Sequence, residues 1–329
     1  MEILIAVALV LAGFLLLIWS ADLLVDNASA LGSQLGVSTF MIGIIVVGFG
    51  TSAPELFVSA MAALQDKGNL ALGNALGSNI TNIGLVLGSA ALVRSLPVEP
   101  STAKIDLPIV IGTGILAIAL VVDGLLSHLD GIILLTVLIA YLIWSGRNSK
   151  EADTEASVTK TSNTLSEPDV NQLNHTAKKS LLSHSLLTLA SIILLMIASR
   201  MLVEGAVKIA EFLGIGELII GLTIVAIGTS LPELAAAIAA ARKGMQEMII
   251  GNIIGSNIFN TLGVLGITGA IKATDVDTGA LARDFPIMFV FTVVMLVFAL
   301  SKGAFSRVEG AIFISCYFGY LGYLIFITV

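Results

Sequence analysis

Cysteine and charge are scarce in this chain of 329 residues. Its single cysteine, Cys316, excludes an intrachain disulfide and redox chemistry between two thiols. Only 12% of the residues are charged, and the net charge of −7 is spread thinly along the sequence. This distribution excludes the basic patch of a nucleic-acid-binding protein. Histidine is also rare: His128, His175 and His184 lie outside the repeated segments described below, so a transition-metal site is not expected.

Apolar residues, by contrast, make up 57% of the chain, and the mean hydropathy is +1.01. Both values are far above those of soluble domains. The apolar residues gather into runs long enough to cross a hydrocarbon layer of about 30 Å as helices. We therefore predict an all-α membrane protein with ten transmembrane helices. The predicted crossings are residues 3–22, 38–62, 70–93, 105–122, 129–147, 181–205, 216–240, 248–270, 285–302 and 308–328.

The basic residues predict the orientation of the chain, because Lys and Arg in short loops stay on the cytoplasmic side. An N-terminus outside the cell places 11 of the 16 basic residues on the cytoplasmic side. They are Arg94, Lys104, Arg147, Lys150, Lys160, Lys178, Lys179, Arg242, Lys243, Lys302 and Arg307. We therefore expect both termini outside.

One long polar stretch, residues 147–180, interrupts the crossings. It is rich in Ser, Thr, Asn, Glu and Asp, and it cannot bury a core of its own. We predict that it is a cytoplasmic linker. It would join a first five-helix repeat, residues 1–146, to a second five-helix repeat, residues 181–329.

The acidic cluster Glu151, Asp153 and Glu155 in this linker has the alternate spacing with which a calcium-binding EF-hand loop opens. Such a loop needs Gly at its sixth position and Glu at its twelfth, and here those positions are Ala156 and Ser162. A solvated linker is therefore the better interpretation.

The two halves resemble each other at a fixed offset of 178 residues. This offset aligns Gly50-Thr51-Ser52-Ala53-Pro54-Glu55 with Gly228-Thr229-Ser230-Leu231-Pro232-Glu233. Residues 40–89 and 218–267 share 21 identities in 50 positions, which indicates duplication. Because each half has five crossings, the second half enters the membrane from the opposite side. Such inverted-topology repeats are typical of secondary transporters, which bind their substrates near the midplane.

Glu55 and Glu233 stand about halfway along otherwise apolar crossings. An ionisable group at this depth costs several kcal/mol, on the order of 3, unless it has a partner. Protonated glutamates that hydrogen-bond between helices are one explanation. Duplication of the glutamate at matched depth favours the other, a pathway for cations.

Hydroxyl and amide side chains accompany each glutamate. Ser52 and Ser230 precede the glutamates by three residues and share a helix face with them. Ser78 and Asn82 share a face of the following crossing, as Ser256 and Asn260 do in the second half. A single intramembrane Ser or Asn usually forms a hydrogen bond between helices. The repeated set of four per half favours a ligand role instead.

Pro54 and Pro232 predict a further source of oxygen, because proline loosens the helical carbonyls before it. Carbonyls near Gly48–Gly50 and Ala226–Gly228 become candidate ligands. All these candidate ligands are oxygens, which suit hard cations. Calcium takes six to eight oxygens, and two carboxylates would balance its charge; sodium could use the same oxygens.

These motifs, together with Gly73-Asn74-Ala75-Leu76-Gly77-Ser78-Asn79-Ile80-Thr81-Asn82 and its counterpart at 251–260, closely resemble the two alpha-repeats of prokaryotic sodium/calcium exchangers, in the calcium/cation antiporter superfamily. The resemblance extends from the first helix to the tenth and leaves out only the linker. It implies an antiporter of the cell membrane, in which the first and sixth helices slide across a core formed by the second, third, seventh and eighth.

The resemblance also implies roles for single residues. Glu55 and Glu233 would be the shared calcium ligands. The flanking sodium sites would be completed by Thr51, Ser52, Ser78, Asn82, Thr229, Ser230, Ser256 and Asn260, with the carbonyl oxygens of Gly48 and Ala226. Some relatives carry Asp at the position of Asn260, so the site here has two carboxylates and not three. No cofactor is expected, and the transported ions would be calcium and sodium.

Two alternatives remain from the sequence. Two close carboxylates titrate as a coupled pair, so protons could replace sodium as the counter-ion and make the protein a calcium/proton antiporter. An intramembrane hydrolase that uses Ser52 or Ser230 is the second. A serine nucleophile needs a nearby base, and the repeated helices contain no histidine.

Overall fold

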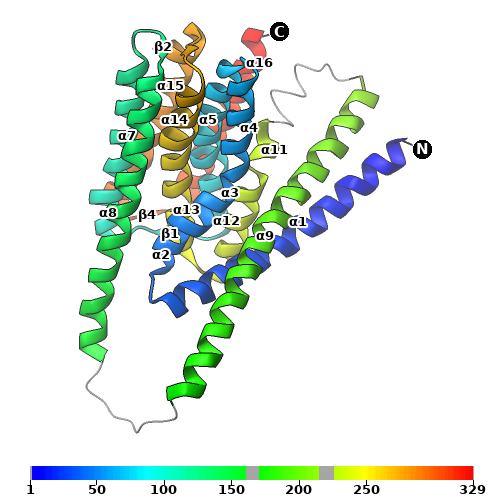
Figure 1. Ribbon diagram of the computed structural model, residues 1–329. Coiled ribbons are helices and arrows are strands. Elements are labelled where there is room, and N and C mark those ends of the chain that lie inside the picture. Colours follow the sequence, from blue (N-terminus) through cyan, green and yellow to red (C-terminus); the bar gives the residue numbers. More distant parts are fainter. Residues whose placement is uncertain (1, 161–169, 215–225, 329) are drawn as a thin grey trace.

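The computed structural model describes residues 2–160, 170–214 and 226–328, which form a bundle of long helices (Figure 1). Helices predominate because backbone groups in hydrocarbon must find their hydrogen bonds within the segment. The first half contains α1 (Glu2–Leu35), α2 (Thr39–Ile42), η1 (Gly43–Gly48), α3 (Phe49–Thr51), α4 (Ala53–Leu64), α5 (Gly68–Thr81), η2 (Asn82–Leu87), α6 (Gly88–Val93), η3 (Thr102–Asp106), α7 (Leu107–Val121) and α8 (His128–Lys160), where η marks a π-helical segment.

The second half repeats this order. It contains α9 (Val170–Phe212), α11 (Ala226–Thr229), α12 (Leu231–Lys243), α13 (Gln246–Ile258), η5 (Phe259–Val264), α14 (Leu265–Ile271), η6 (Ala280–Asp284), α15 (Phe285–Lys302) and α16 (Arg307–Thr328). Four two-residue strands connect helices: β1 (Leu96–Pro97), β2 (Leu125–Leu126), β3 (Thr274–Asp275) and β4 (Ala304–Phe305).

Within the described residues, eight helices are long and apolar enough to cross a membrane. A further crossing is broken: Thr39–Thr51 and Ala53–Leu64 are bent by 41° where they meet. The predicted crossing 216–240 begins in residues 215–225, which lie outside the described part of the chain, and its described part is α11 and α12. The expected all-helical, multi-pass membrane fold is confirmed.

Several helices run past the predicted ends of the crossings. α1 continues from residue 22 to Leu35 and stops where Gly36 takes a positive φ of 64°. α8 continues to Lys160 and α9 begins at Val170, so both helices extend into the predicted linker. The reason is that a helix satisfies its own backbone in water as well as in lipid. The side chains of Glu151, Asp153 and Glu155 lie outside the described residues.

The short strands show that the two halves are inverted. Leu96 in β1 pairs with Phe305 in β4, and Leu126 in β2 pairs with Thr274 in β3. Thr274 stands 178 residues after Leu96, so the equivalent strands β1 and β3 belong to different pairs. Figure 1 places β1 and β4 toward one end of the bundle and β2 toward the other. Equivalent segments therefore lie at opposite ends, as an inverted repeat requires.

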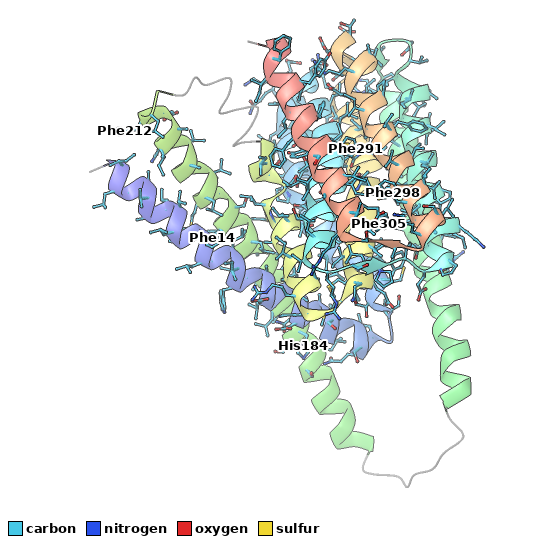
Figure 2. All side chains as sticks on the ribbon, turned by 180° about the vertical axis from the view of Figure 1, so that it is seen from behind. Phe14, His184, Phe212, Phe291, Phe298 and Phe305 are labelled. Atoms are coloured by element: carbon cyan, nitrogen blue, oxygen red, sulfur yellow. The ribbon has the colours of Figure 1, made fainter. Side chains whose placement is uncertain are left out.

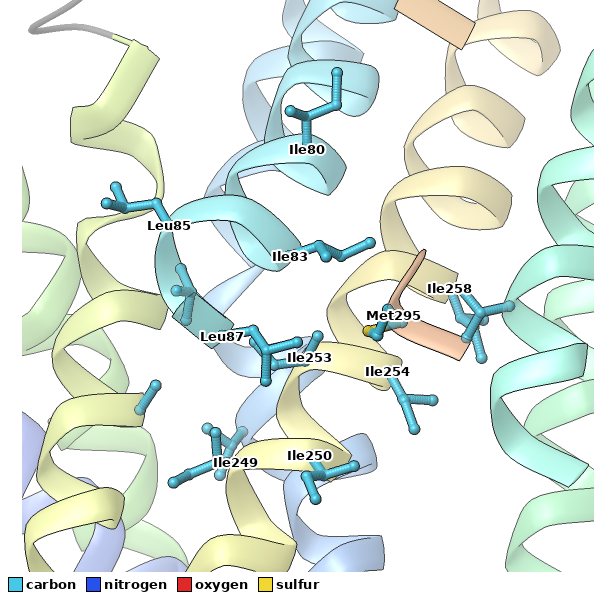
Figure 3. Packing of buried hydrophobic residues seen from close by; sticks show 14 of the residues in the cluster. Ile80, Ile83, Leu85, Leu87, Ile249, Ile250, Ile253, Ile254, Ile258 and Met295 are labelled. Atoms are coloured by element: carbon cyan, nitrogen blue, oxygen red, sulfur yellow. The ribbon is translucent and has the colours of Figure 1, made fainter. Parts of the chain in front are cut away.

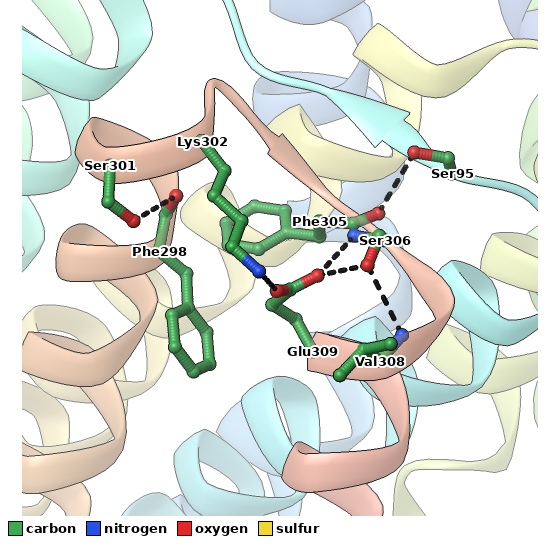
Figure 4. A network of polar contacts seen from close by, with 8 residues as sticks. All are labelled: Ser95, Phe298, Ser301, Lys302, Phe305, Ser306, Val308 and Glu309. Atoms are coloured by element: carbon green, nitrogen blue, oxygen red, sulfur yellow. Dashed lines mark hydrogen bonds and ion pairs between the residues drawn. The ribbon is translucent and has the colours of Figure 1, made fainter.

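A polar network fixes the end of the bundle that carries β4 (Figure 4). Glu309 is 1% exposed, and its carboxylate accepts hydrogen bonds from the hydroxyl and the backbone N–H of Ser306. Lys302 approaches the same carboxylate at 2.5 Å. In the first half, Asp130 accepts equivalent bonds from Ser127 at 2.6 and 2.8 Å. Each pair caps the first turn of its helix, α8 or α16.

The centre of the bundle is formed by the two helices that carry the repeated Gly-Asn motifs. Within an apolar stretch of 18 residues in each span, 100% of the residues are buried in Gln246–Ile271 and 78% in Gly68–Val93, whereas the share is 22–33% in the other six spans. Figure 3 shows isoleucine and leucine side chains of both spans packed together. Gly251 makes close contact possible, because a Cβ there would meet the carbonyl group of Phe40. The central pair therefore faces protein, and the outer helices face lipid.

α1 and α9 form a separate pair. They lean away from the bundle in Figures 1 and 2, where Phe14 and Phe212 mark them. Gly13 and Gly205 bring their backbones together, since a Cβ at either position would lie within 3.0 Å of a carbonyl oxygen of the other helix. An apolar pocket of about 550 Å³ lies between this pair and α12. Each helix of the pair thus packs more closely on its partner than on α12.

Candidate functional site

Both glutamates stand in the first turn of a helix that restarts in the middle of a crossing. α3 ends at Thr51 and α4 begins at Ala53, so Ser52 lies at the break. Ser230 occupies the same place between α11 and α12, with φ −94° and ψ 7°. The prolines Pro54 and Pro232 explain the breaks, since neither can donate a backbone hydrogen bond. Each carboxylate therefore lies at the positive end of a helix dipole.

Glu55 and Glu233 are each 1% exposed. No ion pair in the described part of the chain involves either of them. Ser52, three residues before Glu55 in the chain, brings the first repeat to the carboxylate of Glu233. The Ser52 hydroxyl donates a hydrogen bond to Oε1 of Glu233 at 3.3 Å, and it thereby joins the two halves. The sequence prediction that both glutamates belong to one site stays a prediction, and this geometry supports it.

Many buried polar atoms of the repeated motifs have no hydrogen-bond partner. In the described residues they include both carboxylate oxygens of Glu55, Oε2 of Glu233, the hydroxyl of Ser230, both amide atoms of Asn82, both amide atoms of Asn260, and Nδ2 of Asn252. An unpartnered buried polar group costs about 1–3 kcal/mol. A bound cation would satisfy the oxygens of this set, so their number points to an ion-binding site.

π-helical segments begin at the two amide ligand candidates. Asn82 is the first residue of η2, and Asn260 is the second residue of η5. Gly48, whose carbonyl is a candidate ligand, is the last residue of η1. A π-helical turn widens the helix, and such turns occur often at functional sites. Helical periodicity in the sequence does not reveal them.

The remaining candidates of the first half are buried or bonded within the broken crossing. Thr51 is 1% exposed, its hydroxyl donates to the Val47 carbonyl at 2.9 Å, and it also lies next to Glu233. Ser78 is 4% exposed. The Gly48 carbonyl accepts the backbone N–H of Ser52 at 3.1 Å.

In the second half, the Ser256 hydroxyl reaches the Gly48 carbonyl at 3.4 Å. Thr229 is the last residue of α11 and is half-buried. Ala226 begins α11 beside residues 215–225 that the structure does not describe, so its ligand role stays a prediction.

Two features were not expected. The Gly228 carbonyl is not free, because the Ser199 hydroxyl donates to it at 2.6 Å. Asn252 lies 3.4 Å from the Ser256 hydroxyl, although the sequence gave it no role beyond its place in the Gly-Asn motif. The only sequence feature that marked Asn252 was its identity with Asn74 in the first repeat. Identity between the repeats does not tell which of the residues common to both face the site.

The neighbourhood of the two serines does not suit a hydrolase. His184 contacts Asn27 at 3.0 Å, and His128 contacts the Ala270 carbonyl. Neither histidine contacts Ser52 or Ser230 in the described residues, and the side chain of His175 lies outside them. No group of three or more His, Cys, Asp or Glu among the described residues is arranged to hold a metal ion. The site is therefore two carboxylates surrounded by neutral oxygens.

Comparison with known proteins identifies the family of this chain. The family described as sodium/calcium exchanger protein matches residues 5–147 and 183–326. A putative antiporter, CaxA, of Alkalimonas amylolytica is 40% identical over 326 residues, which cover 98% of this chain and 99% of that protein. The sodium/calcium exchanger MaX1 of Methanosarcina acetivorans is 30% identical over 343 residues, which cover 97% and 98%.

A solved structure of the sodium-calcium exchanger NCX_Mj, soaked with zero Na⁺ and Ca²⁺, has a TM-score of 0.82 and 30% identity to this chain. The match covers 98% of this chain and 99% of that one. These relatives are transporters and not enzymes. The chain belongs to the sodium/calcium exchanger protein family.

Proposed function

We propose that this protein is a secondary active antiporter that exchanges calcium for sodium by alternating access at a single midplane site. The family and the sodium/calcium exchangers among its relatives support the choice of ions. The observation that carries the proposal is the pair Glu55 and Glu233, which are buried, linked across the repeats through the hydrogen bond from Ser52 to Glu233, and without a cationic partner in the described residues. Two carboxylates balance the charge of one calcium ion.

In this proposal the two glutamates share calcium. Hydroxyl, amide and carbonyl oxygens complete its shell and form the sodium sites beside it. They come from Thr51, Ser52, Ser78, Asn82, Thr229, Ser230, Ser256, Asn260, Gly48 and Ala226. Neutral oxygens suit sodium, which carries a single charge. Because both ions depend on the same carboxylates, binding of sodium displaces calcium, and this competition couples the two fluxes.

Alternating access follows from the separation of α1 and α9 from the rest of the bundle. Their close mutual packing and the apolar pocket beside α12 support movement as one unit across the site. Polar links to α12 are few: in the described residues, Lys243 pairs with Asp26 at 2.7 Å and with Asp22 at 3.6 Å. Lateral sliding therefore breaks few strong contacts.

The proposed location is the inner (cell) membrane of a prokaryote, with both termini outside and residues 147–180 in the cytoplasm. The distribution of basic residues supports this orientation. Figure 1 shows α8 and α9 extending beyond the bundle at the end opposite to the C-terminus of α16. A cysteine introduced at Ser157 should react with a membrane-impermeant maleimide only after the inside face is exposed.

Calcium/proton exchange through the same site is the second candidate, because two close carboxylates can also exchange protons. Calcium uptake into proteoliposomes separates the two functions. We expect uptake when an outward sodium gradient is imposed, and none with a proton gradient alone. Uptake driven by the proton gradient without sodium would overturn the choice of counter-ion. Absence of uptake with either gradient would overturn the proposed function.

A further inference from the structure

The two repeats use their equivalent asparagines differently. Asn74 donates hydrogen bonds from Nδ2 to the Ser59 hydroxyl at 3.0 Å and to the Glu55 carbonyl at 3.3 Å. Asn252 stands 178 residues later, and its Nδ2 has no partner in the described residues. Asn74 therefore ties α5 to α4, whereas Asn252 provides no such tie.

The sequence explains this difference. The residue equivalent to Ser59 is Ala237, which is 1% exposed and has no hydroxyl to offer. The amide of Asn252 turns its oxygen toward Ser256 instead, at 3.4 Å. An unpartnered buried N–H group is unfavourable, so Asn252 contributes less to the stability of the helix pair than Asn74 does. Its presence in the buried centre needs another explanation.

Ser256 offers that explanation, because its hydroxyl can donate its single proton to either of two neighbouring oxygens. The Gly48 carbonyl and Oδ1 of Asn252 each lie 3.4 Å from Oγ of Ser256. When the hydroxyl donates to Gly48, the proton lies between two oxygens that could both face a cation. When it donates to Asn252, no proton of Ser256 lies between its oxygen and a cation, and the Gly48 carbonyl, which still accepts the backbone N–H of Ser52, has its second lone pair open to the ion.

We propose that Asn252 is a positioning residue for sodium: it accepts the hydroxyl proton of Ser256 and thereby turns the Ser256 oxygen and the Gly48 carbonyl toward the ion. This inference rests on the proposed function and adds a residue to it. Asn252 itself does not touch the ion. Asn74 has no such role, because its amide is bound to α4.

The replacement Asn252→Ala tests this assignment, with Asn74→Ala as the matched control in the other repeat. Two measurements are needed on purified, reconstituted protein: the sodium concentration that gives half-maximal calcium exchange, and the thermal stabilisation by sodium chloride relative to choline chloride. We expect Asn252→Ala to raise the sodium concentration for half-maximal calcium exchange (the sodium requirement) about fivefold. This factor corresponds to the net free energy of one typical hydrogen bond. Asn74→Ala should lower thermal stability and leave the sodium requirement unchanged.

A double-mutant cycle with Ser256→Ala then separates positioning from a structural role. If Asn252 acts through Ser256, the double variant needs no more sodium than Ser256→Ala alone. Additive effects, or an unchanged sodium requirement in Asn252→Ala while the wild type exchanges calcium for sodium, would overturn the inference alone. A wild type that neither exchanges calcium for sodium nor is stabilised by sodium would overturn the proposed function, and the inference with it.

Discussion

The Ser52 hydroxyl donates a hydrogen bond to Oε1 of Glu233 at 3.3 Å, although 181 residues separate the two. Ser52 belongs to the first repeat and Glu233 to the second. Ser52 lies at the break of its crossing and Glu233 in the first turn after the break of the other, so the hydrogen bond brings the two breaks together. Neither half alone contributes two carboxylates, so the proposed site requires both repeats.

Glu55→Gln and Glu233→Gln should each abolish calcium transport in proteoliposomes while the protein still inserts and purifies. Either change leaves a bound calcium ion only half neutralised in a low-dielectric site. Glu309→Gln is the matched control, since Glu309 is equally buried but lies in the polar network beside β4. It should lower thermal stability and leave calcium transport in place. Normal uptake by either site variant would remove the basis of the proposed site.

Sodium-driven exchange should move net charge. A site with two carboxylates balances one calcium ion, and a sodium load of more than two ions carries excess positive charge. One charge moved across about 100 mV is worth about 2.3 kcal/mol. We expect the initial rate of calcium uptake to change when valinomycin and potassium set the membrane potential. A rate that is independent of potential would favour an electroneutral mechanism.

Removal of residues 151–172 should leave transport nearly intact. Of these residues, 151–160 belong to α8 and 170–172 to α9, outside the candidate membrane spans, and the candidate ligands all lie elsewhere. Calcium exchange by the deletion variant should match the wild type within about twofold, a difference of about 0.4 kcal/mol. A folded deletion variant that loses activation by cytoplasmic calcium would show that Glu151, Asp153 and Glu155 form a regulatory site.

Transport should need no potassium. Both amide atoms of Asn260 are buried without a partner in the described residues, so this side chain offers a dipole and no third negative charge. Another cation would lack a counter-charge here. Calcium uptake should be equal in potassium-free buffer and with potassium on both sides. Loss of uptake without potassium would mean that a further cation site exists in the bundle.

Gly251→Ala should destabilise the bundle, because the added Cβ would meet the carbonyl group of Phe40. Such overpacking costs about 1–3 kcal/mol. Gly112→Ala is the control, since a Cβ there would contact nothing within 4 Å. Thermal unfolding in detergent should show a lower midpoint for Gly251→Ala and an unchanged or higher one for Gly112→Ala. Equal midpoints would contradict the close packing of α13 on α2.

Sequence reasoning reached the helical membrane fold and the repeat because both leave local marks: long apolar runs, and motifs at a constant offset. It also selected Glu55 and Glu233, since a charged residue in an apolar run is conspicuous. The breaks at Ser52 and Ser230 follow from the prolines two residues later.

Other features depend on contacts between helices that are distant in the sequence, which helical periodicity does not display. The direction of the Asn252 amide is set by the absence of a hydroxyl at Ala237 on a neighbouring helix. The Gly228 carbonyl is occupied by Ser199, whose counterpart in the first repeat is Ala21. The π-helical segments η2 and η5 interrupt helices whose apolar sequence gives no sign of a wider turn. None of these is encoded by periodicity along one helix.

Equilibrium binding of calcium-45 to the purified protein, titrated with sodium, tests the central claim most directly. One midplane site shared by the two repeats predicts one calcium ion per chain, displaced by sodium and absent from both Glu55→Gln and Glu233→Gln. Two calcium ions per chain, or undiminished binding in either variant, would contradict a single site built from both glutamates.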